Sequence, residues 1–343
     1  MCLAFLMTID YNRQRQGEPH SKGSSALIKY IIIGFVVLFI LVEIVKTFVF
    51  LKIAIGRVKE RKKAEKISKK DMEEASYQTK SQKSQEWILA QNPEEITIEG
   101  HHQTILKGHF LRAKDEKRII IAFHGWHGSW KSDFSLCTEK FLEQGCSILL
   151  VEQRAHGRSG GKHIGFGILE RYDCKKWAEY IEERFGKEMP TYLYGVSMGA
   201  STVLMASSLH LPENMKGIIA DCGFTTPYQM VVRFAHKILK IGEYPDVPMV
   251  NKLCQVMAGY DFKEYSTLDA MKVCKLPVLF IHGTKDYFVP YYMTLENFHQ
   301  CKARKELLLV EGAGHCRSFY MAPEEYMQKI QQFFQWNRQS VQC

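Results

Sequence analysis

The chain lacks most of the sequence features that mark nucleic-acid-binding and metal-binding proteins. Its 343 residues contain no internal repeat, no long low-complexity tract and no nucleic-acid-binding motif. None of its ten cysteines forms a C-x-x-C pair, so a structural zinc site or a thioredoxin-like redox site has no support. We interpret the cysteines as free, mostly buried thiols in a reducing compartment. Disulfides are an open alternative, because their connectivity is not encoded in spacing alone.

Positive charge is concentrated in the N-terminal region. The net charge is +9, and residues 1–90 hold 16 Lys and Arg against 9 Asp and Glu, whereas residues 91–343 hold 30 against 28. A basic stretch beside an apolar segment fits an anionic lipid surface better than DNA. We therefore expect membrane lipid as a partner and no nucleic acid.

That apolar segment predicts a single transmembrane anchor over residues 26–51. Tyr30–Val42 carries no charge, and the segment becomes long enough to span a bilayer, about 20 residues, only when it is extended to Leu51. The interrupting Glu43 and Lys46 stand at i and i+3, so they can pair on one helix face. A cleaved signal peptide is the rival, but no convincing small-residue cleavage site follows the apolar core. A buried soluble helix is disfavoured because the segment is apolar on every side.

The segments beside the anchor indicate its orientation. Residues 1–25 form a polar tail with few basic residues near the anchor, whereas residues 52–92 are a charged linker or helix rich in lysine and arginine. The positive-inside rule then places the C-terminal side in the cytoplasm. We interpret residues 52–92 as a solvated spacer without a binding partner.

Residues 93–343 show the pattern of one α/β domain. Two alternating runs, Ile96–Ile98 and Ile105–Leu111, suit half-buried antiparallel strands. Six continuous apolar runs follow and suit central parallel strands; they are residues 118–123, 147–151, 191–194, 217–220, 277–281 and 306–310. Amphipathic segments separate several of them. This order predicts a mostly parallel, doubly wound sheet, and the mostly helical residues 224–275 predict a small cap.

The strongest local motif is G-x-S-x-G at residues 195–199. It follows the apolar run TYLY and precedes a helix-like segment, which is the strand–turn–helix context of a nucleophile elbow. A sharp turn there exposes the Ser197 hydroxyl and brings strand and helix so close that only glycine fits on either side. Ser197 is therefore the candidate nucleophile.

A serine hydroxyl needs a base, and the base needs an acid to orient it. In folds with this elbow the chain order is serine, acid, histidine. His315 lies in a glycine-rich loop after the last predicted strand, and Asp286 follows the strand before it. Asp221 also ends a strand and is the alternative acid, although its other role would be to bond backbone in its own loop.

The oxyanion hole is expected from two backbone amides. The loop after the strand at residues 118–123 supplies one N–H in such folds, and the residue after the nucleophile supplies the other. These are the amides of Trp126 and Met198. His124 and His127 would suit a metal by spacing, but no third ligand is evident, so we expect neither metal nor cofactor.

Together these features resemble the α/β-hydrolase superfamily, over roughly residues 95–338. Within it the chain is similar to bacterial serine aminopeptidase-like and esterase-like hydrolases. The motifs that carry the resemblance are FHGWHGS (123–129), EQRAHGRSGG (152–161), GVSMG (195–199), HGTKDYFVP (282–290) and GAGH (312–315). The second departs from the family pattern D-x-R-G-H-G-x-S at Glu152 and Ala155, in a turn to which we assign no chemistry.

The resemblance implies a serine hydrolase that cleaves an ester through an acyl-enzyme, acting on a small-molecule, short acyl or peptide substrate. A peptidase or thioesterase would use the same triad. An alternative of another class is a non-catalytic, membrane-anchored binding module on the same fold. All three triad positions are filled, which disfavours that alternative.

Overall fold

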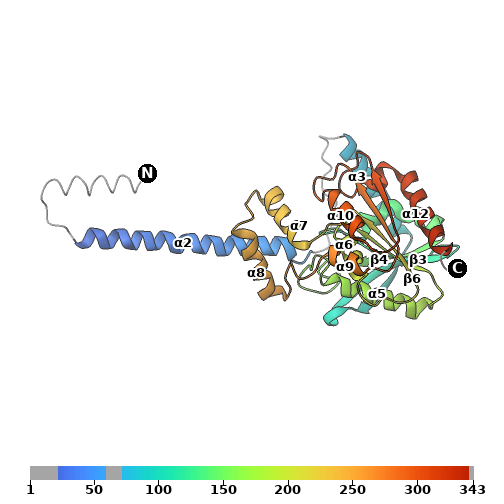
Figure 1. The fold of residues 1–343 in the computed structure, drawn as a ribbon, viewed down its shortest axis with the longest axis horizontal. Helices are drawn as coiled ribbons and strands as arrows, with labels where there is room; N and C mark the ends of the chain where they lie inside the picture. Colours follow the sequence, from blue (N-terminus) through green and yellow to red (C-terminus); the bar gives the residue numbers. More distant parts are fainter. Residues whose placement is uncertain (1–21, 59–71, 340–343) are drawn as a thin grey trace. The chain divides into compact units, whose positions relative to one another are not determined.

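A computed structural model describes residues 22–58 and 72–339 of the chain (Figure 1). These residues divide into two compact units, one ending at Val49 and the other beginning at Phe50. The basic run at residues 59–71, on which part of the predicted orientation depends, and two of the ten cysteines, Cys2 and Cys343, lie outside the described residues.

The first unit consists of most of one long helix, α2 (Lys22–Ile55). Its segment Leu27–Ile55 is long and apolar enough to cross a membrane, a test that a signal sequence near the N-terminus also passes. Glu43 and Lys46 pair on the helix at 2.6 Å between Oε2 and Nζ, so their charges neutralise each other within the apolar stretch.

The end of α2 belongs to the second unit. Phe50, Leu51, Ala54 and Ile55 are buried there, whereas Lys52 stays exposed on the opposite side of the helix. Beyond the helix, Val58 exchanges backbone hydrogen bonds with the loop at residues 155–157. The predicted boundary between anchor and linker at residue 51 therefore falls inside helix α2. The charged Lys52 ends the apolar sequence, but it lies on the exposed side of the helix, and the buried side continues through Ala54 and Ile55.

An eight-stranded sheet forms the centre of the second unit, with strand order β1-β2-β4-β3-β5-β6-β7-β8. β2 pairs antiparallel with β1 and β4, and all the other pairs are parallel. The strands are β1 (Glu94–Glu99), β2 (Ile105–Leu111), β3 (Arg118–Phe123), β4 (Cys146–Glu152), β5 (Thr191–Val196), β6 (Met215–Asp221), β7 (Val278–Gly283) and β8 (Lys305–Val310). The predicted mostly parallel, doubly wound sheet is confirmed.

Helices cover both faces of the sheet, because alternate side chains of each buried strand point to opposite sides. One core cluster joins Ile120 and Ala122 of β3 to helices α3, α4 and α12, and another joins Ile119 and Ile121 to α5, α6 and α9. Figure 1 shows these two layers on either side of the strands. The helices are α3 (Met72–Ala90), α4 (Trp130–Glu143), α5 (Glu170–Phe185), α6 (Met198–Ala206), α9 (Thr267–Val273), α10 (Tyr292–Gln300), α11 (Ser318–Met321) and α12 (Pro323–Gln339), with a short 3-10 turn η1 (His101–Gln103).

The cap is smaller than the predicted 224–275. It comprises α7 (Pro227–Phe234), the π-helix η2 (Ala235–Leu239) and α8 (Asp246–Ala258). These elements share a third apolar cluster with the end of α2, where the rings of Phe50 and Phe234 lie 5.8 Å apart. α9, which falls in the same predicted region, packs against α6 and α10 and belongs to the layer that covers the sheet.

Helix α3 is not the solvated spacer expected from the charged sequence of residues 52–92. It packs along α4, and its Ile88 is fully buried in a core cluster with Trp130 and Phe134. The interpretation failed because α3 contributes few apolar side chains to the core. Trp87 packs at the edge of the same cluster and Tyr77 contacts Tyr320, but most of the helix is polar. A polar helix face has the same composition whether it meets solvent or protein.

Candidate active site

The predicted site residues meet at the carboxyl edge of the sheet. Ser197 follows β5, Asp286 follows β7 and His315 follows β8. The loop at residues 124–128 follows β3, which pairs directly with β5. Parallel neighbouring strands end on one edge, so segments far apart in sequence converge there.

The turn at Ser197 has the backbone of a nucleophile elbow. Ser197 adopts φ 56° and ψ −116°, a conformation that a residue with a side chain rarely takes. A Cβ at Gly199 would collide with the Phe123 carbonyl, and one at Gly195 would collide with the backbone of Gly199. Both glycines are therefore required by the close approach of β5, α6 and β3.

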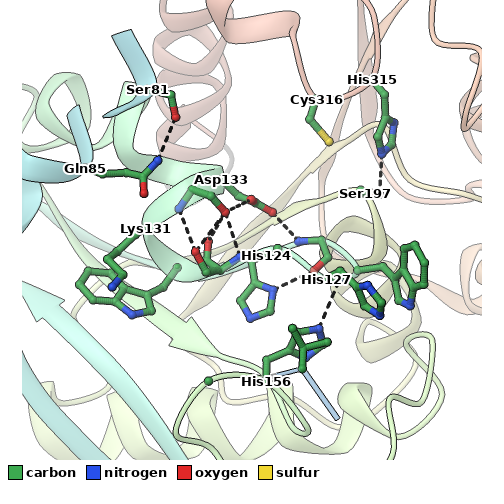
Figure 2. A pocket seen from close by; sticks show the side chains of 18 of the residues that line it. Ser81, Gln85, His124, His127, Lys131, Asp133, His156, Ser197, His315 and Cys316 are labelled. Atoms are coloured by element: carbon green, nitrogen blue, oxygen red, sulfur yellow. Dashed lines mark hydrogen bonds between the residues drawn. The ribbon is translucent and has the colours of Figure 1, made fainter. Parts of the chain in front are cut away.

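A continuous hydrogen-bond chain joins the three predicted triad side chains. Ser197 Oγ lies 3.0 Å from His315 Nε2, and His315 Nδ1 lies 2.6 Å from Asp286 Oδ2. The first of these bonds is drawn in Figure 2. Both distances fall within the range in which a base can remove a hydroxyl proton and an acid can orient the base.

Asp286 is held as a carboxylate by its surroundings. Its Oδ1 accepts hydrogen bonds from the amides of Phe288 and Val289, at 2.9 and 2.8 Å. Burial alone would raise the pKa of the carboxyl, but hydrogen bonds with His282 and His315 outweigh it and lower the pKa to about 2. Asp286 therefore stays negatively charged at neutral pH.

His315 carries the opposite shift. Burial would lower the pKa of its imidazole, but the nearby sulfur of Cys222 and the hydrogen bond with Asp286 raise it above the ordinary value of 6.5. Burial also raises the pKa of the Cys222 thiol well above its usual range, so the thiol is protonated at neutral pH. The Asp286 carboxylate is then the negative charge that stabilises a protonated His315.

Asp221, the alternative acid, lies in a different network. Its carboxylate accepts hydrogen bonds from Ser318 Oγ at 3.2 Å and Tyr326 Oη at 3.0 Å. Burial raises its pKa to about 6. No hydrogen bond joins Asp221 to His315 in the described part of the chain, so the geometry favours Asp286 as the acid.

The amides on either side of Trp126 in the predicted oxyanion loop are both engaged. The amide of Gly125 donates to Asp133 Oδ2 at 2.7 Å, and the amide of His127 donates to His156 Nε2 at 3.3 Å (Figure 2). The amides of Trp126 and Met198 donate to no acceptor within residues 22–58 and 72–339. An oxyanion hole requires a free N–H group on a backbone that its neighbours hold in place, and the loop around Trp126 has this arrangement.

The turn after β4, to which no chemistry was assigned, supports that loop. The backbone N–H of Gln153 donates to His124 Nε2 at 3.1 Å, and His124 Nδ1 hydrogen-bonds the Gly125 carbonyl at 2.9 Å. His156 also bonds Arg154 O through its other nitrogen. Both nitrogens of His124 and of His156 are thus used within the protein, so they serve as supports for the loop.

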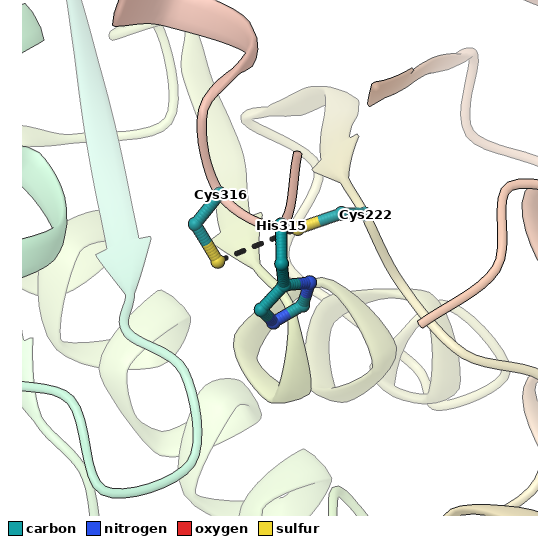
Figure 3. A group of neighbouring side chains, drawn as sticks. All are labelled: Cys222, His315 and Cys316. Atoms are coloured by element: carbon teal, nitrogen blue, oxygen red, sulfur yellow. Dashed lines mark hydrogen bonds between the residues drawn. The ribbon is translucent and has the colours of Figure 1, made fainter. Parts of the chain in front are cut away.

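Two thiols that sequence spacing could not connect lie beside His315, the predicted base. The Sγ atoms of Cys222 and Cys316 are 3.6 Å apart, and with a nitrogen of His315 they form a group whose atoms all lie within 4.8 Å (Figure 3). Cys222 follows β6 and Cys316 follows His315. Only the sheet order brings their loops together, so no local signal predicted this pair.

The Trp126 side chain reaches away from the sheet. Its Nε1 donates to the Ala54 carbonyl at the end of α2, at 2.8 Å, and its ring meets Phe234 of the cap edge-on. The last turn of α2 and the cap therefore position the residue whose amide is the predicted oxyanion donor. No sequence signal connected residue 54 to this loop.

A cavity of about 700 Å³ opens in front of Ser197 and His315. Part of the cavity wall consists of three aromatic side chains, those of Trp126, Trp130 and Phe288. The remaining wall includes one face of α3, with Gln78, Ser81 and Gln85 among its lining residues. Figure 2 shows Ser81 and Gln85 in this wall. Sequence reasoning missed α3 as part of the site because it treated the whole charged segment as a spacer.

The sequence profile of the prolyl oligopeptidase family matches residues 167–342, just over half of the chain. The chain belongs to this family. The match covers the turn at Ser197 and the loops of Asp286 and His315, and it starts after the predicted oxyanion loop.

Curated relatives match about two thirds of this chain. An uncharacterised Bacillus subtilis protein, YqkD, is 26% identical over 66% of this chain and 74% of its own. The α/β-hydrolase domain-containing protein 17C of Xenopus tropicalis is 34% identical over 65% of this chain and 64% of its own, and the human 17C protein is 26% identical. This chain thus spans only about three fifths of the length of the 17C relatives.

Solved structures agree on the fold. The Pyrococcus furiosus esterase Pf2001 matches with a TM-score of 0.61 and 21% identity, over 81% of this chain and 97% of the esterase. Est1E from Butyrivibrio proteoclasticus, solved with ferulic acid bound, matches with a TM-score of 0.53 and 19% identity, over 68% of this chain and 98% of its own. The predicted α/β-hydrolase fold is confirmed, and the chain is a hydrolase of that fold.

Proposed function

We propose that this hydrolase is a serine hydrolase that cleaves an ester through an acyl-enzyme. The observation that carries the proposal is the chain of hydrogen bonds from Ser197 through His315 to Asp286. His315 takes the Ser197 proton as the serine oxygen attacks the carbonyl carbon, and Asp286 stabilises the resulting imidazolium. The amides of Trp126 and Met198 hold the oxyanion. His315 then protonates the leaving alcohol, and a water molecule activated by the same histidine releases the acid.

Peptide-bond cleavage is the second candidate, because the matched family is one of oligopeptidases. The same residues perform it, with an amine in place of the alcohol as leaving group. A thioesterase would also use this triad. The triad cannot separate these reactions, since the bond that is cleaved depends on what the cavity binds.

We expect a fluorophosphonate probe to label Ser197 and no other serine. The probe phosphonylates a serine, with loss of fluoride, only where a base activates the hydroxyl, and Ser197 Oγ is hydrogen-bonded to His315 Nε2. Mass spectrometry of tryptic peptides locates the adduct, and a panel of ester, thioester and dipeptide substrates then ranks the three reactions. An unlabelled Ser197 in folded, full-length protein would contradict the proposal and would favour the non-catalytic binding module.

We also propose that α2 anchors the chain in a membrane, with the hydrolase unit in the cytoplasm. The supports are the length and apolarity of Leu27–Ile55, the internal Glu43–Lys46 pair and the excess of lysine and arginine after the helix.

Membrane fractionation of the producing cells tests the anchor. The full chain is expected to stay in the membrane pellet after washing with alkaline carbonate, and its hydrolase unit is expected to resist protease added outside intact cells. Release into the wash, or processing of the N-terminus as a signal sequence, would contradict the anchor. Digestion by external protease would contradict only the orientation.

A further inference from the structure

Helix α3 is fixed to the loop that follows the catalytic histidine. Arg317 Nη2 bonds both carboxylate oxygens of Glu74, at 2.9 and 3.2 Å, and the Arg317 guanidinium lies 3.1 Å from the centre of the Tyr77 ring. Tyr320 meets the same ring edge-on at 5.1 Å. At the other end of the helix, Ile88 is fully buried. α3 is therefore a fixed wall whose position is tied to that of His315.

The face of α3 that lines the cavity is polar but carries no charge. Gln78, Ser81 and Gln85 recur at steps of three and four residues, so they form one stripe along the helix. Gln85 Nε2 donates to Ser81 Oγ at 3.1 Å, as Figure 2 shows. The charged side chains of Lys80 and Lys83 belong to other faces of α3 and do not line the cavity.

One acceptor in this stripe has unmet hydrogen-bonding capacity. Gln78 Nε2 donates to Glu74 Oε1 at 2.9 Å, but its Oε1 is buried and has no partner among the residues that the structure describes. A buried amide oxygen without a donor is costly. A stripe that offers amide donors, a hydroxyl and this acceptor is suited to a group that both accepts and donates hydrogen bonds.

We propose that α3 determines substrate specificity by binding a neutral, hydrogen-bonding group of the substrate, such as a hydroxyl or an amide. This inference rests on the proposed serine hydrolase activity and names the substrate class of that site. The cavity places the stripe in the same space as Ser197 and His315. An alkyl chain in that position would remove the glutamine amides from water without replacing their hydrogen bonds, which is unfavourable. The charged residues that line the cavity, Lys131, Asp133 and Glu152, come from outside α3, so the stripe itself offers only neutral hydrogen-bonding groups.

Two pairs of substrates of equal size test the proposal. Monoacetylglycerol and pentyl acetate differ in the leaving alcohol, and the para-nitrophenyl esters of methoxyacetic and butanoic acid differ in the acyl group. We expect the wild-type protein to prefer the oxygen-rich member of at least one pair in kcat/KM. Gln78→Met and Gln85→Met are each expected to reduce that preference roughly two- to tenfold, the value of one hydrogen bond, mainly through KM. Acid release in a pH-stat measures all four substrates.

The matched control is Lys83→Met, which introduces the same side chain on an exposed face of the same helix. It is expected to leave both ratios unchanged. If the glutamine variants slow both members of each pair equally, α3 supports the fold only and the inference is wrong. If the methionine variants do not fold, Gln85→Glu keeps size and polarity but removes the amide donor, and it should lower the preference for the methoxy ester; an unchanged ratio there would also overturn the inference.

The two proposals fail separately. Hydrolysis that persists after Ser197→Ala would overturn the serine mechanism whatever the ratios show. Hydrolysis that depends on Ser197, with ratios that no α3 substitution changes, would overturn only the role of α3.

Discussion

Ser197→Ala is expected to lower kcat by about 10⁴-fold or more, because it removes the atom that would form the proposed acyl-enzyme. The remaining oxyanion donors and the bound substrate leave only the slower direct attack of water. Hydrolysis of a para-nitrophenyl ester by the full-length protein measures the loss. The same preparation should also lose its fluorophosphonate labelling.

The substitution should leave the fold unchanged. The Ser197 hydroxyl makes a hydrogen bond to His315 at a site that opens on the cavity, and alanine keeps the Cβ that the strained turn already accommodates. The thermal unfolding midpoint is the check. Ser208→Ala, beyond the end of α6, is the matched control and should keep full activity, because its hydroxyl bonds only a backbone carbonyl. An active Ser197→Ala protein would refute the assigned nucleophile.

The parts of the site that sequence could predict share one property. Ser197, Asp286 and His315 each follow a continuous apolar run, and parallel strands bring such positions to one edge of a sheet. Gly195 and Gly199 also predict the sharp turn around Ser197, because the structure leaves no room for a Cβ at either position. Local sequence was therefore sufficient to predict which residues converge wherever a motif and a strand end coincide; their catalytic roles stay a prediction.

The choice between the two acids was open in the sequence because both end neighbouring strands of the sheet. The structure separates them through their hydrogen-bond partners, and the partner of Asp221 is distant in sequence. Tyr326, on α12, bonds Asp221, whereas the amides of Phe288 and Val289 hold Asp286. Hydrogen bonds between segments a hundred residues apart leave no periodic pattern, so they could not be predicted.

The role of α3 could not be predicted for a different reason. Apolar periodicity reports which face of a helix is buried in a core. Helix α3 is held instead by an Arg317–Glu74 ion pair, by the edge-on contact of Tyr77 with Tyr320 and by a single fully buried isoleucine. Its cavity face is as polar as a solvent face. The hydrogen bond from Trp126 Nε1 to the Ala54 carbonyl could not be predicted either, because every residue type has a backbone carbonyl that can accept a hydrogen bond.

Asp286→Asn is expected to lower kcat by up to about 10⁴-fold, whereas Asp221→Asn should cost less than about tenfold. An asparagine at 286 keeps the shape but offers an amide where His315 Nδ1 needs an acceptor, so the imidazole loses its orientation and its tautomer. Asp221 touches Ser318 and Tyr326, neither of which reaches the nucleophile by a hydrogen bond in the described residues. Ester hydrolysis by the two variants, with thermal unfolding as the control for folding, measures the contrast. The reverse ranking would transfer the acid to Asp221.

The pH dependence of the two variants separates an orienting acid from a merely structural one. His315 acts as a base only when it is neutral, so kcat/KM of the wild type should rise with pH and reach half its maximum above 6.5, because the pKa of His315 is raised. Asp286→Asn removes the carboxylate that favours the imidazolium, so its residual activity should reach half-maximum at a lower pH. Asp221→Asn should leave the midpoint close to that of the wild type. A pH profile of kcat/KM supplies this measurement. A loss of folded protein would scale the whole curve without moving its midpoint, so a shifted midpoint in Asp286→Asn alone would assign the charge that His315 faces to Asp286.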